Sequence, residues 1–224
     1  MNYHNITYPD MNNGSGLRVV LWLSGCDHKC KGCQNPQTWD ANSGILFDAK
    51  AKEELFRELD KDYISGLTLT GGDPLHPSNL DGVLDIVTEF NKRYRITQDM
   101  VSNENDNHNM LNGNVNKIRL LCPNKTIWIY SGFTWEQIFS PEKCYKQIDE
   151  LVLEDNNWAT LKMRYDNSNF MKRAKIIGLS DIFVDGCYID SQRNIQLRYR
   201  GSENQRVIDV QESLRQNKIV LYCD

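Results

Sequence analysis

Three cysteines lie within eight positions near the N-terminus, at a spacing that suits metal chemistry. The stretch GCDHKCKGCQN (25–35) contains Cys26, Cys30 and Cys33, and His28 lies between the first two. Thiolates are the usual protein ligands of iron–sulfur clusters, and thiolates together with imidazoles bind structural zinc. The loop therefore predicts a metal centre of one of these two kinds.

The two kinds of centre differ in how many ligands they need. Three cysteines on a four-iron cluster leave one iron free, which suits an enzyme that binds its substrate directly to the metal. A structural zinc site closes with four ligands and would recruit His28 or one of the remaining cysteines, which are Cys122, Cys144, Cys187 and Cys223. On spacing alone the two interpretations carry equal weight. His28 by itself fits a loop residue beside such a site better than a ligand.

The elements that must position this loop are apolar runs that end in glycine. LRVVLWLSG (17–25) is rich in β-branched residues and predicts a strand buried on both faces, and the cysteines begin where it ends. ISGLTLTGGDP (64–74) predicts a strand that runs into a Gly-Gly turn. Further strands are predicted in KTIWIYSG (125–132), SDIFVDG (180–186) and KIVLY (218–222).

Helical patterns alternate with these strands. They lie in AKEELFRELDKD (51–62), LDGVLDIVTEFNKRY (80–94) and TWEQIF (134–139), where Thr134 and Gln137 are spaced as a capping box. The alternation predicts an α/β fold of βαβ units with a mainly parallel sheet. Ligands of such sheets collect at the carboxyl ends of the strands. We expect the chemistry at that edge, where the cysteine loop, the GGDP turn, SGFTW and DG follow their strands.

Length and composition limit the class of protein. The chain has 224 residues, 40% of them hydrophobic, and a net charge of −4, which predicts one folded domain. Its 26 basic residues are spread among 30 acidic ones, which disfavours a nucleic-acid partner. We expect one domain over 1–224 with polar insertions near 95–119, which is rich in asparagine, and near 145–175.

The N-terminal sequence and the number of cysteines indicate a cytoplasmic protein. The N-terminus is polar and lacks the basic-then-apolar order of a signal peptide, and no apolar run is long enough to cross a bilayer. We therefore expect a cytoplasmic protein without a membrane partner. Seven cysteines, an odd number, do not suggest a disulfide framework in a reducing compartment.

The order of the motifs resembles a known superfamily. C-x-x-x-C-x-x-C after a first strand, with Gly71, Gly72 and Asp73 after the next, is similar to the radical S-adenosylmethionine superfamily. GCDHKCKGCQNPQTW, TLTGGDPLHP, IWIYSGFTWE, DIFVDG and YRGSENQRVIDV, in that order, resemble the family of activating proteins of anaerobic (class III) ribonucleoside-triphosphate reductases. The blocks cover roughly two thirds of the chain and leave zinc a minor alternative.

The resemblance implies a fold and an activity. The fold would be an incomplete TIM-type βα barrel, because the chain without its two insertions is too short for eight βα units of roughly 30 residues each. The protein would cleave S-adenosylmethionine reductively to methionine and a 5′-deoxyadenosyl radical, which abstracts hydrogen from a glycine of the reductase. Its partners would be the glycyl-radical subunit of the reductase and an electron donor such as a flavodoxin or ferredoxin.

The resemblance also assigns site residues. Cys26, Cys30 and Cys33 would hold a [4Fe-4S] cluster, and no catalytic residue is expected beyond these ligands. The S-adenosylmethionine would meet Gly32, Cys33 and Gln34 on the cysteine loop, and its amino group would meet Gly72 and Asp73. Asp73 suits this role because a carboxylate accepts charge-assisted hydrogen bonds from an ammonium group.

Several residues have two interpretations. Ser131 and Gly132 either line the adenosine side or simply end a strand. Arg200 and Arg206 of RGSENQR either bind the partner or the cofactor carboxylate, or belong to a solvated loop. For the protein as a whole, the alternatives are an activator of another glycyl-radical enzyme, of the pyruvate formate-lyase activator type, and a zinc-stabilised binding module without turnover.

Overall fold

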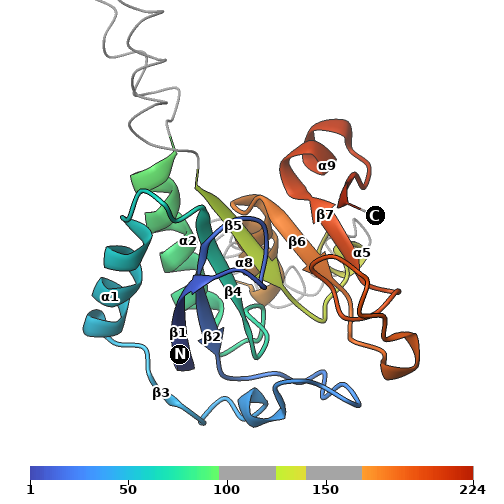
Figure 1. Cartoon of the computed structure of the whole chain (residues 1–224), viewed down its shortest axis with the longest axis horizontal. Helices are drawn as coiled ribbons and strands as arrows, with labels where there is room; N and C mark the ends of the chain where they lie inside the picture. The colour runs from blue at the N-terminus through green and yellow to red at the C-terminus, as the bar shows by residue number, and fades with distance from the viewer. Residues whose placement is uncertain (96–124, 140–167, 224) are drawn as a thin grey trace, which may run out of the picture.

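A mixed β-sheet organises the computed structural model, which describes residues 1–95, 125–139 and 168–223. Within these ranges the sheet has eight strands in the order β3-β1-β2-β4-β5-β6-β7-β8 (Figure 1). The strands are β1 (Asn2–Asp10), β2 (Arg18–Leu23), β3 (Ile45–Leu46), β4 (Gly66–Gly71), β5 (Thr126–Tyr130), β6 (Ile182–Asp185), β7 (Arg206–Asp209) and β8 (Leu221–Cys223).

The centre of the sheet is parallel and its two sides are antiparallel. Strands β2, β4, β5 and β6 pair in parallel. The other four pairings, of β1 with β2 and β3 and of β7 with β6 and β8, are antiparallel. The expected mainly parallel sheet therefore describes only the central strands. The connections β1–β2 and β6–β7 contain no crossover α-helix, and a parallel pair needs such a crossover.

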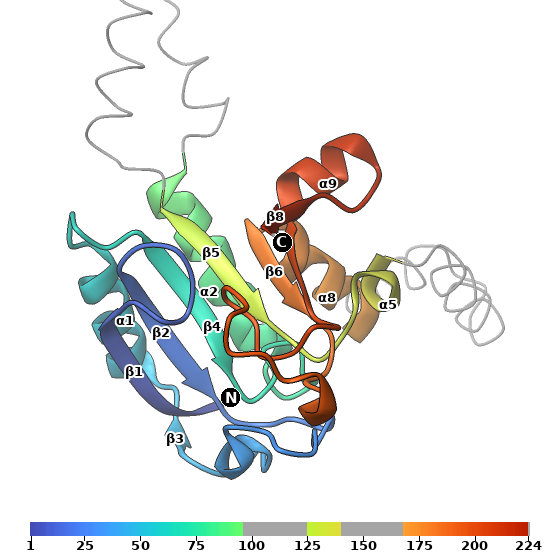
Figure 2. The same cartoon turned by 45° about the vertical axis from the view of Figure 1, so that its right-hand side comes forward.

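The α-helices cover one face of the sheet. In the described part of the chain they are α1 (Ala49–Leu59), α2 (Leu80–Tyr94), α5 (Trp135–Phe139), α8 (Asn169–Gly178) and α9 (Val210–Gln216). Figure 2 shows α1, α2 and α8 behind the strands, and Figure 1 shows α2 and α8 behind the central strands with α1 at their left side. Leu21, Leu69 and Ile129 belong to the same buried cluster as residues of these helices. The aliphatic side of each central strand thus forms the core.

The opposite face of the central strands carries polar and aromatic side chains and a second, smaller apolar cluster of Trp128, Ile182, Val184 and Val207. Side chains alternate along each strand, so Trp22, Thr70 and Tyr130 lie on the face away from the aliphatic cluster and line a cavity there. Arg18 is fully buried on this face, where its guanidinium donates to the Oγ1 atom of Thr68 at 2.7 Å. This face is therefore built to hold a polar ligand rather than a second layer of helices.

The predicted strands and helices are present with shifted ends, and the capping box is confirmed because Thr134 N donates to Gln137 Oε1 at 2.9 Å. Of the two predicted insertions, residues 96–119 and 145–167 lie outside the described residues. The described end of the second one, 168–175, contains the start of α8 and has no fully buried residue, and the buried Ile176 and Ile177 follow it. The two insertions therefore stay predictions.

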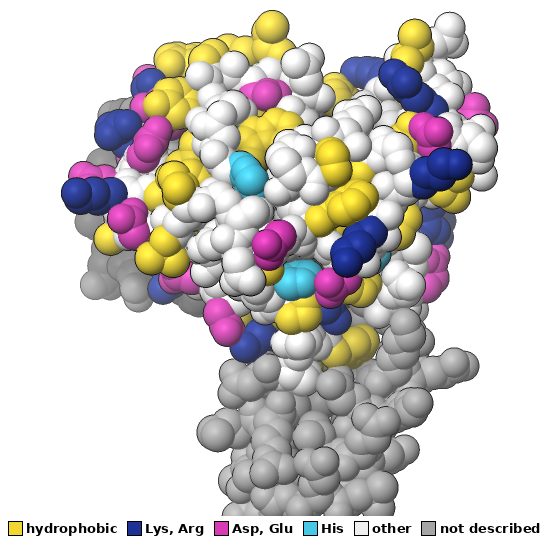
Figure 3. Space-filling model, turned by 90° about the horizontal axis from the view of Figure 1, so that it is seen from below, with side chains coloured by type: hydrophobic (Ala, Val, Ile, Leu, Met, Phe, Trp, Pro, Cys, Tyr) yellow, Lys and Arg dark blue, Asp and Glu magenta, His cyan; other side chains and the backbone are white. Residues whose placement is uncertain are grey.

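The helices and the surface charge bear on membrane and nucleic-acid partners. Among the helices of the described ranges, none combines the length and apolar character needed to cross a bilayer. On the face seen in Figure 3, Lys and Arg side chains alternate with Asp and Glu side chains. The described part of that face presents no continuous basic surface, in line with the mixed charge of the sequence.

Candidate metal centre

A cavity of about 450 Å³ lies at the carboxyl ends of the central strands. Its walls come from the loops that follow β2, β4, β5 and β6, which parallel pairing brings to one edge. The expected site residues that line it are Cys26, Cys30, Cys33, Gln34, Gly72 and Asp73, together with Ser131, Gly132 and Arg200. Of the expected cofactor contacts, only Gly32 is absent from this lining.

The cysteine loop is held in an irregular conformation by its own backbone. Gly25 ends β2 with a φ of 96°, a conformation that favours glycine. Cys33 N donates to Cys30 O at 3.1 Å, and Asn35 N donates to Cys33 Sγ at 3.4 Å. Gly32 also has a positive φ, and a Cβ there would lie 2.7 Å from Asp190 Oδ1. Gly32 thus serves the turn between two thiols.

The Gly-Gly turn after β4 is joined to the start of the cysteine loop. Gly72 N donates to Leu23 O and Asp73 N to Gly25 O, both at 2.7 Å. A Cβ on Gly72 would lie 2.6 Å from Gly25 O, closer than real contacts allow. Glycine at this position therefore lets the two loops touch backbone to backbone, and the turn fixes where the first cysteine begins.

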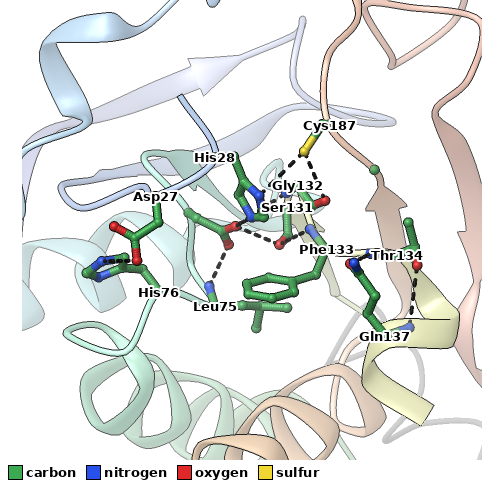
Figure 4. Close-up of polar contacts among 12 residues, drawn as sticks. Asp27, His28, Leu75, His76, Ser131, Gly132, Phe133, Thr134, Gln137 and Cys187 are labelled. Atoms are coloured by element: carbon green, nitrogen blue, oxygen red, sulfur yellow. Dashed lines mark hydrogen bonds and ion pairs between the residues drawn. The ribbon is translucent and has the colours of Figure 1, made fainter. Parts of the chain in front are cut away.

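Asp73 is buried, with 2% of its surface exposed, and its carboxylate accepts hydrogen bonds from the protein. Its Oδ2 atom lies 2.7 Å from His28 Nε2 and 2.9 Å from Ser131 Oγ, and its Oδ1 atom accepts from Leu75 N at 2.8 Å. Figure 4 shows His28, Ser131 and Leu75 converging from three segments. From the sequence we expected Asp73 to contact a cofactor, and we did not predict its hydrogen bonds from these protein donors.

The contact with Asp73 also changes the chemistry of His28. The hydrogen bond to the carboxylate raises the pKa of His28, while burial opposes that shift. His28 lies edge-on to the Phe133 ring, with ring centroids 4.8 Å apart. The imidazole is therefore fixed by two partners beside the cysteine loop, as expected for a residue that supports a site rather than for a free loop side chain.

Cys187 is a fourth thiol in the same cavity, and the sequence suggested it only as one of four cysteines that could complete a zinc site. Its Sγ atom lies 3.4 Å from His28 Nδ1 and donates to Gly132 O at 3.4 Å (Figure 4). Burial and, after it, the neighbouring Cys30 raise the pKa of Cys187 to about 11. The signal that could have found it is position, because Cys187 follows the DG turn of a strand that pairs with β5.

RGSENQR holds the turn that presents Cys187. Asn204 Nδ2 donates to Cys187 O at 2.8 Å, and Gln205 Nε2 donates to Gly186 O at 3.0 Å. The Gln205 Oε1 atom accepts from Gly201 N at 3.0 Å, which closes the motif on itself. The motif therefore fixes the loop after β6 through side-chain hydrogen bonds to its carbonyl groups.

Arg206 is committed to ion pairs. Its guanidinium donates to both carboxylate oxygens of Glu136 at 2.9 Å and, through Nε, to Asp185 Oδ1 at 3.0 Å. These bonds lower the pKa of Glu136 to about 2. Asp185 is 1% exposed, so the pair with Arg206 supplies the partner that a buried carboxylate needs. Arg206 therefore holds β7 to α5, a role that the interpretations from the sequence did not include.

The far wall of the cavity contains polar atoms that no protein group satisfies. Within the described ranges, Tyr130 OH and Arg200 Nε are buried and have no hydrogen-bond partner. Both residues line the cavity that the cysteines enter. A buried polar group without a partner costs about 1–3 kcal/mol. Both atoms can donate, so the cavity suits a ligand that carries acceptor groups.

The donor set fits an iron–sulfur cluster. The cysteines of the loop are free thiols at one cavity, and burial raises the pKa of Cys26 to about 11, so metal must displace its proton. Among the described side chains, no three His, Cys, Asp or Glu groups converge on a single ion position. A four-iron cluster can bind each thiolate through a different iron and does not require such convergence, whereas a closed zinc site does.

Known proteins resemble this chain over almost its full length. A family model described as a 4Fe-4S single cluster domain matches residues 12–114 and 99–208. A protein of Enterobacteria phage T4 is 31% identical, over 92% of this chain and 93% of its own. Proteins of Vibrio cholerae and Escherichia coli K12 are each 30% identical, over 92% of this chain and 96% and 97% of their own. All three are named anaerobic ribonucleoside-triphosphate reductase-activating protein.

Proposed function

Because the chain belongs to the family of anaerobic ribonucleoside-triphosphate reductase-activating proteins, we propose that it activates such a reductase by cleaving S-adenosylmethionine reductively and forming a glycyl radical on the reductase. The observation that carries the proposal is the meeting of the three loop thiols and the Gly-Gly-Asp turn at one cavity. The match to a 4Fe-4S domain supports the cluster. Membership of the radical S-adenosylmethionine superfamily is part of this proposal.

Each group would have a distinct task. Cys26, Cys30 and Cys33 would hold the cluster, which when bound supplies the single electron for cleavage of the substrate sulfonium. The protein supplies orientation and excludes water. Gln34 lines the cavity next to Cys33, on the loop that we propose meets S-adenosylmethionine.

The remaining contacts follow from charge and from unsatisfied donors. Asp73 places a buried carboxylate at the cavity, where it would attract the amino group of S-adenosylmethionine, and Gly72 would let that group approach the backbone. Tyr130 and Arg200 line the cavity with buried donors that have no protein partner, and these would donate to acceptor groups of the substrate. These four residues lie on three different loops and strands, so they would fix the substrate from several sides.

The fold and the partners complete the proposal. In the described sheet, β3 and β8 are end strands without a second neighbour, and we propose that this open sheet is an incomplete TIM-type barrel. Such an opening would admit the glycine-bearing segment of the reductase subunit. Reductive cleavage needs a one-electron donor, for which a flavodoxin or ferredoxin has the required chemistry.

Anaerobic reconstitution with iron and sulfide tests the proposal directly. With a one-electron reductant and S-adenosylmethionine, the protein should form 5′-deoxyadenosine and methionine, and the reductase should then show a glycyl-radical signal. Serine at Cys26, Cys30 or Cys33 should abolish both products, whereas Cys223→Ser, on the end strand β8, should not. Bound zinc without iron would support the binding module instead. Radical formation on pyruvate formate-lyase and none on the reductase would favour the other activator.

A further inference from the structure

We propose that Cys187 is an exchangeable fourth ligand of the cluster, bound to the iron that the loop cysteines leave free whenever S-adenosylmethionine is absent. The inference rests on the proposed function for the presence of a cluster and of S-adenosylmethionine. It goes beyond that function because the loop cysteines alone were expected to be ligands. Thiolate is the usual protein ligand of iron in such clusters, and Cys187 brings one more thiol to the cavity.

The position of the Cys187 sulfur carries the inference. It lines the same cavity as Cys26, Cys30 and Cys33, the three expected ligands. Its other neighbours are His28 Nδ1 and Gly132 O, each at 3.4 Å. Sulfur makes only weak hydrogen bonds, so these contacts orient the thiol at little cost to its release.

The backbone around Cys187 is fixed in a way that an incidental surface cysteine does not need. Gly186 precedes it with a φ of 93°, which turns the chain sharply at the end of β6. Asn204 and Gln205 bind the carbonyls of Cys187 and Gly186. The side chain is therefore held at the cavity before any ligand arrives, as metal ligands are when their surroundings orient them.

Cys187 differs from Cys223 in its location relative to the cavity. Cys223 is also a free, half-buried thiol, but it lies on β8 and does not line the cavity. The exchange itself balances without electron transfer: an iron–sulfur bond forms, the thiol proton passes to solvent, and S-adenosylmethionine later displaces the thiolate. Cys187 would thereby protect an iron that otherwise faces solvent.

The test compares wild type, Cys187→Ser and Cys223→Ser after anaerobic reconstitution, without S-adenosylmethionine or reductase. Mild oxidation removes the least protected iron and leaves a three-iron cluster, which electron paramagnetic resonance detects. Cys187→Ser should give a several-fold larger three-iron signal than wild type and Cys223→Ser. Prior addition of S-adenosylmethionine should reduce the signal of Cys187→Ser to the wild-type level.

A second measurement reports the exchange. If the thiolate and S-adenosylmethionine compete for one iron, Cys187→Ser should bind S-adenosylmethionine several-fold more tightly than wild type. Equal three-iron signals and equal affinities in all three proteins would overturn the role of Cys187 while leaving the proposed function intact. A wild-type protein that binds a cluster but does not cleave S-adenosylmethionine would instead overturn the proposed function. Failure of the wild-type protein to bind iron would overturn both.

Discussion

His28 Nε2 lies 2.7 Å from Asp73 Oδ2, and this contact joins the cysteine loop to the turn that follows β4. The carboxylate also accepts from Ser131 Oγ at 2.9 Å, so it connects three of the loops around the cavity. Asp73 therefore has a structural task in addition to the proposed contact with S-adenosylmethionine.

Asp73→Asn tests these two tasks separately. The amide keeps the shape but removes the charge and presents N–H groups where the carboxylate accepts, so we expect the cluster-free protein to lose about 1–3 kcal/mol of unfolding free energy. Affinity for S-adenosylmethionine should also fall. Urea unfolding and ligand binding measure the two effects, with exposed Asp62→Asn as the control. Unchanged stability with weaker binding would show that only the ligand needs the carboxylate.

The central strands could be predicted because an apolar, β-branched run buried on both faces is a strong local signal. Strand β1 gave no such signal, since Tyr3 and Ile6 are buried among polar neighbours and the strand gains its stability from pairing with β2. Helix α8 was not predicted, because charged residues surround its buried Ile176 and Ile177. In these two elements tertiary contacts outweigh local composition.

The cysteine loop and the Gly-Gly-Asp turn could be placed together from the sequence, since neighbouring parallel strands end at one edge. The DG turn before Cys187 was expected at the same edge, but the contact of its thiol with the cysteine loop was not predicted, because it depends on β6 lying beside β5 and on hydrogen bonds from Asn204 and Gln205 to the turn. The ion pair between Arg206 and Glu136 could not be predicted either, because the two residues are 70 positions apart in the sequence.

Gly72→Ala should disturb the metal centre through the backbone. The added Cβ would meet Gly25 O at 2.6 Å and must push the cysteine loop away from β4. We expect a lower iron content after reconstitution and a loss of unfolding free energy of about 1–3 kcal/mol, typical of overpacking. Gly178→Ala is the matched control, because a Cβ there meets nothing within 4 Å. Equal iron content in both variants would refute this role of Gly72.

Glu136 should make stability depend on pH on the acid side. Its folded pKa, about 2, lies below its ordinary value of 4.5, so its pairing with Arg206 stabilises the fold above pH 4.5 and is lost as the pH falls toward 2. The side chain is 60% exposed, and solvent screening keeps the effect small. Glu136→Gln should flatten the decline in unfolding free energy between about pH 5 and pH 3, whereas the exposed Glu53→Gln on α1 should retain it. Parallel curves for wild type and Glu136→Gln would contradict the assignment.

Arg18 should be the most costly of these positions to replace. It has no exposed surface, and burial lowers its pKa to about 10, so it is still charged at neutral pH. It donates to Leu67 O and Thr126 O, both at 2.6 Å, and its guanidinium carbon lies 5.4 Å from the centroid of the Trp128 ring. These bonds tie β2 to β4 and β5 on the polar face of the sheet.

Arg18→Met keeps much of the side-chain volume but leaves those carbonyl oxygens without their guanidinium donor. We expect a loss of about 2–4 kcal/mol in unfolding free energy, since several buried hydrogen bonds to a charged group disappear together. Urea unfolding followed by tryptophan fluorescence measures it, with Arg57→Met, whose side chain is 63% exposed, as the control. A loss no larger than that of the control would mean that burying the Arg18 charge costs as much as its hydrogen bonds return, as occurs for some buried ion pairs.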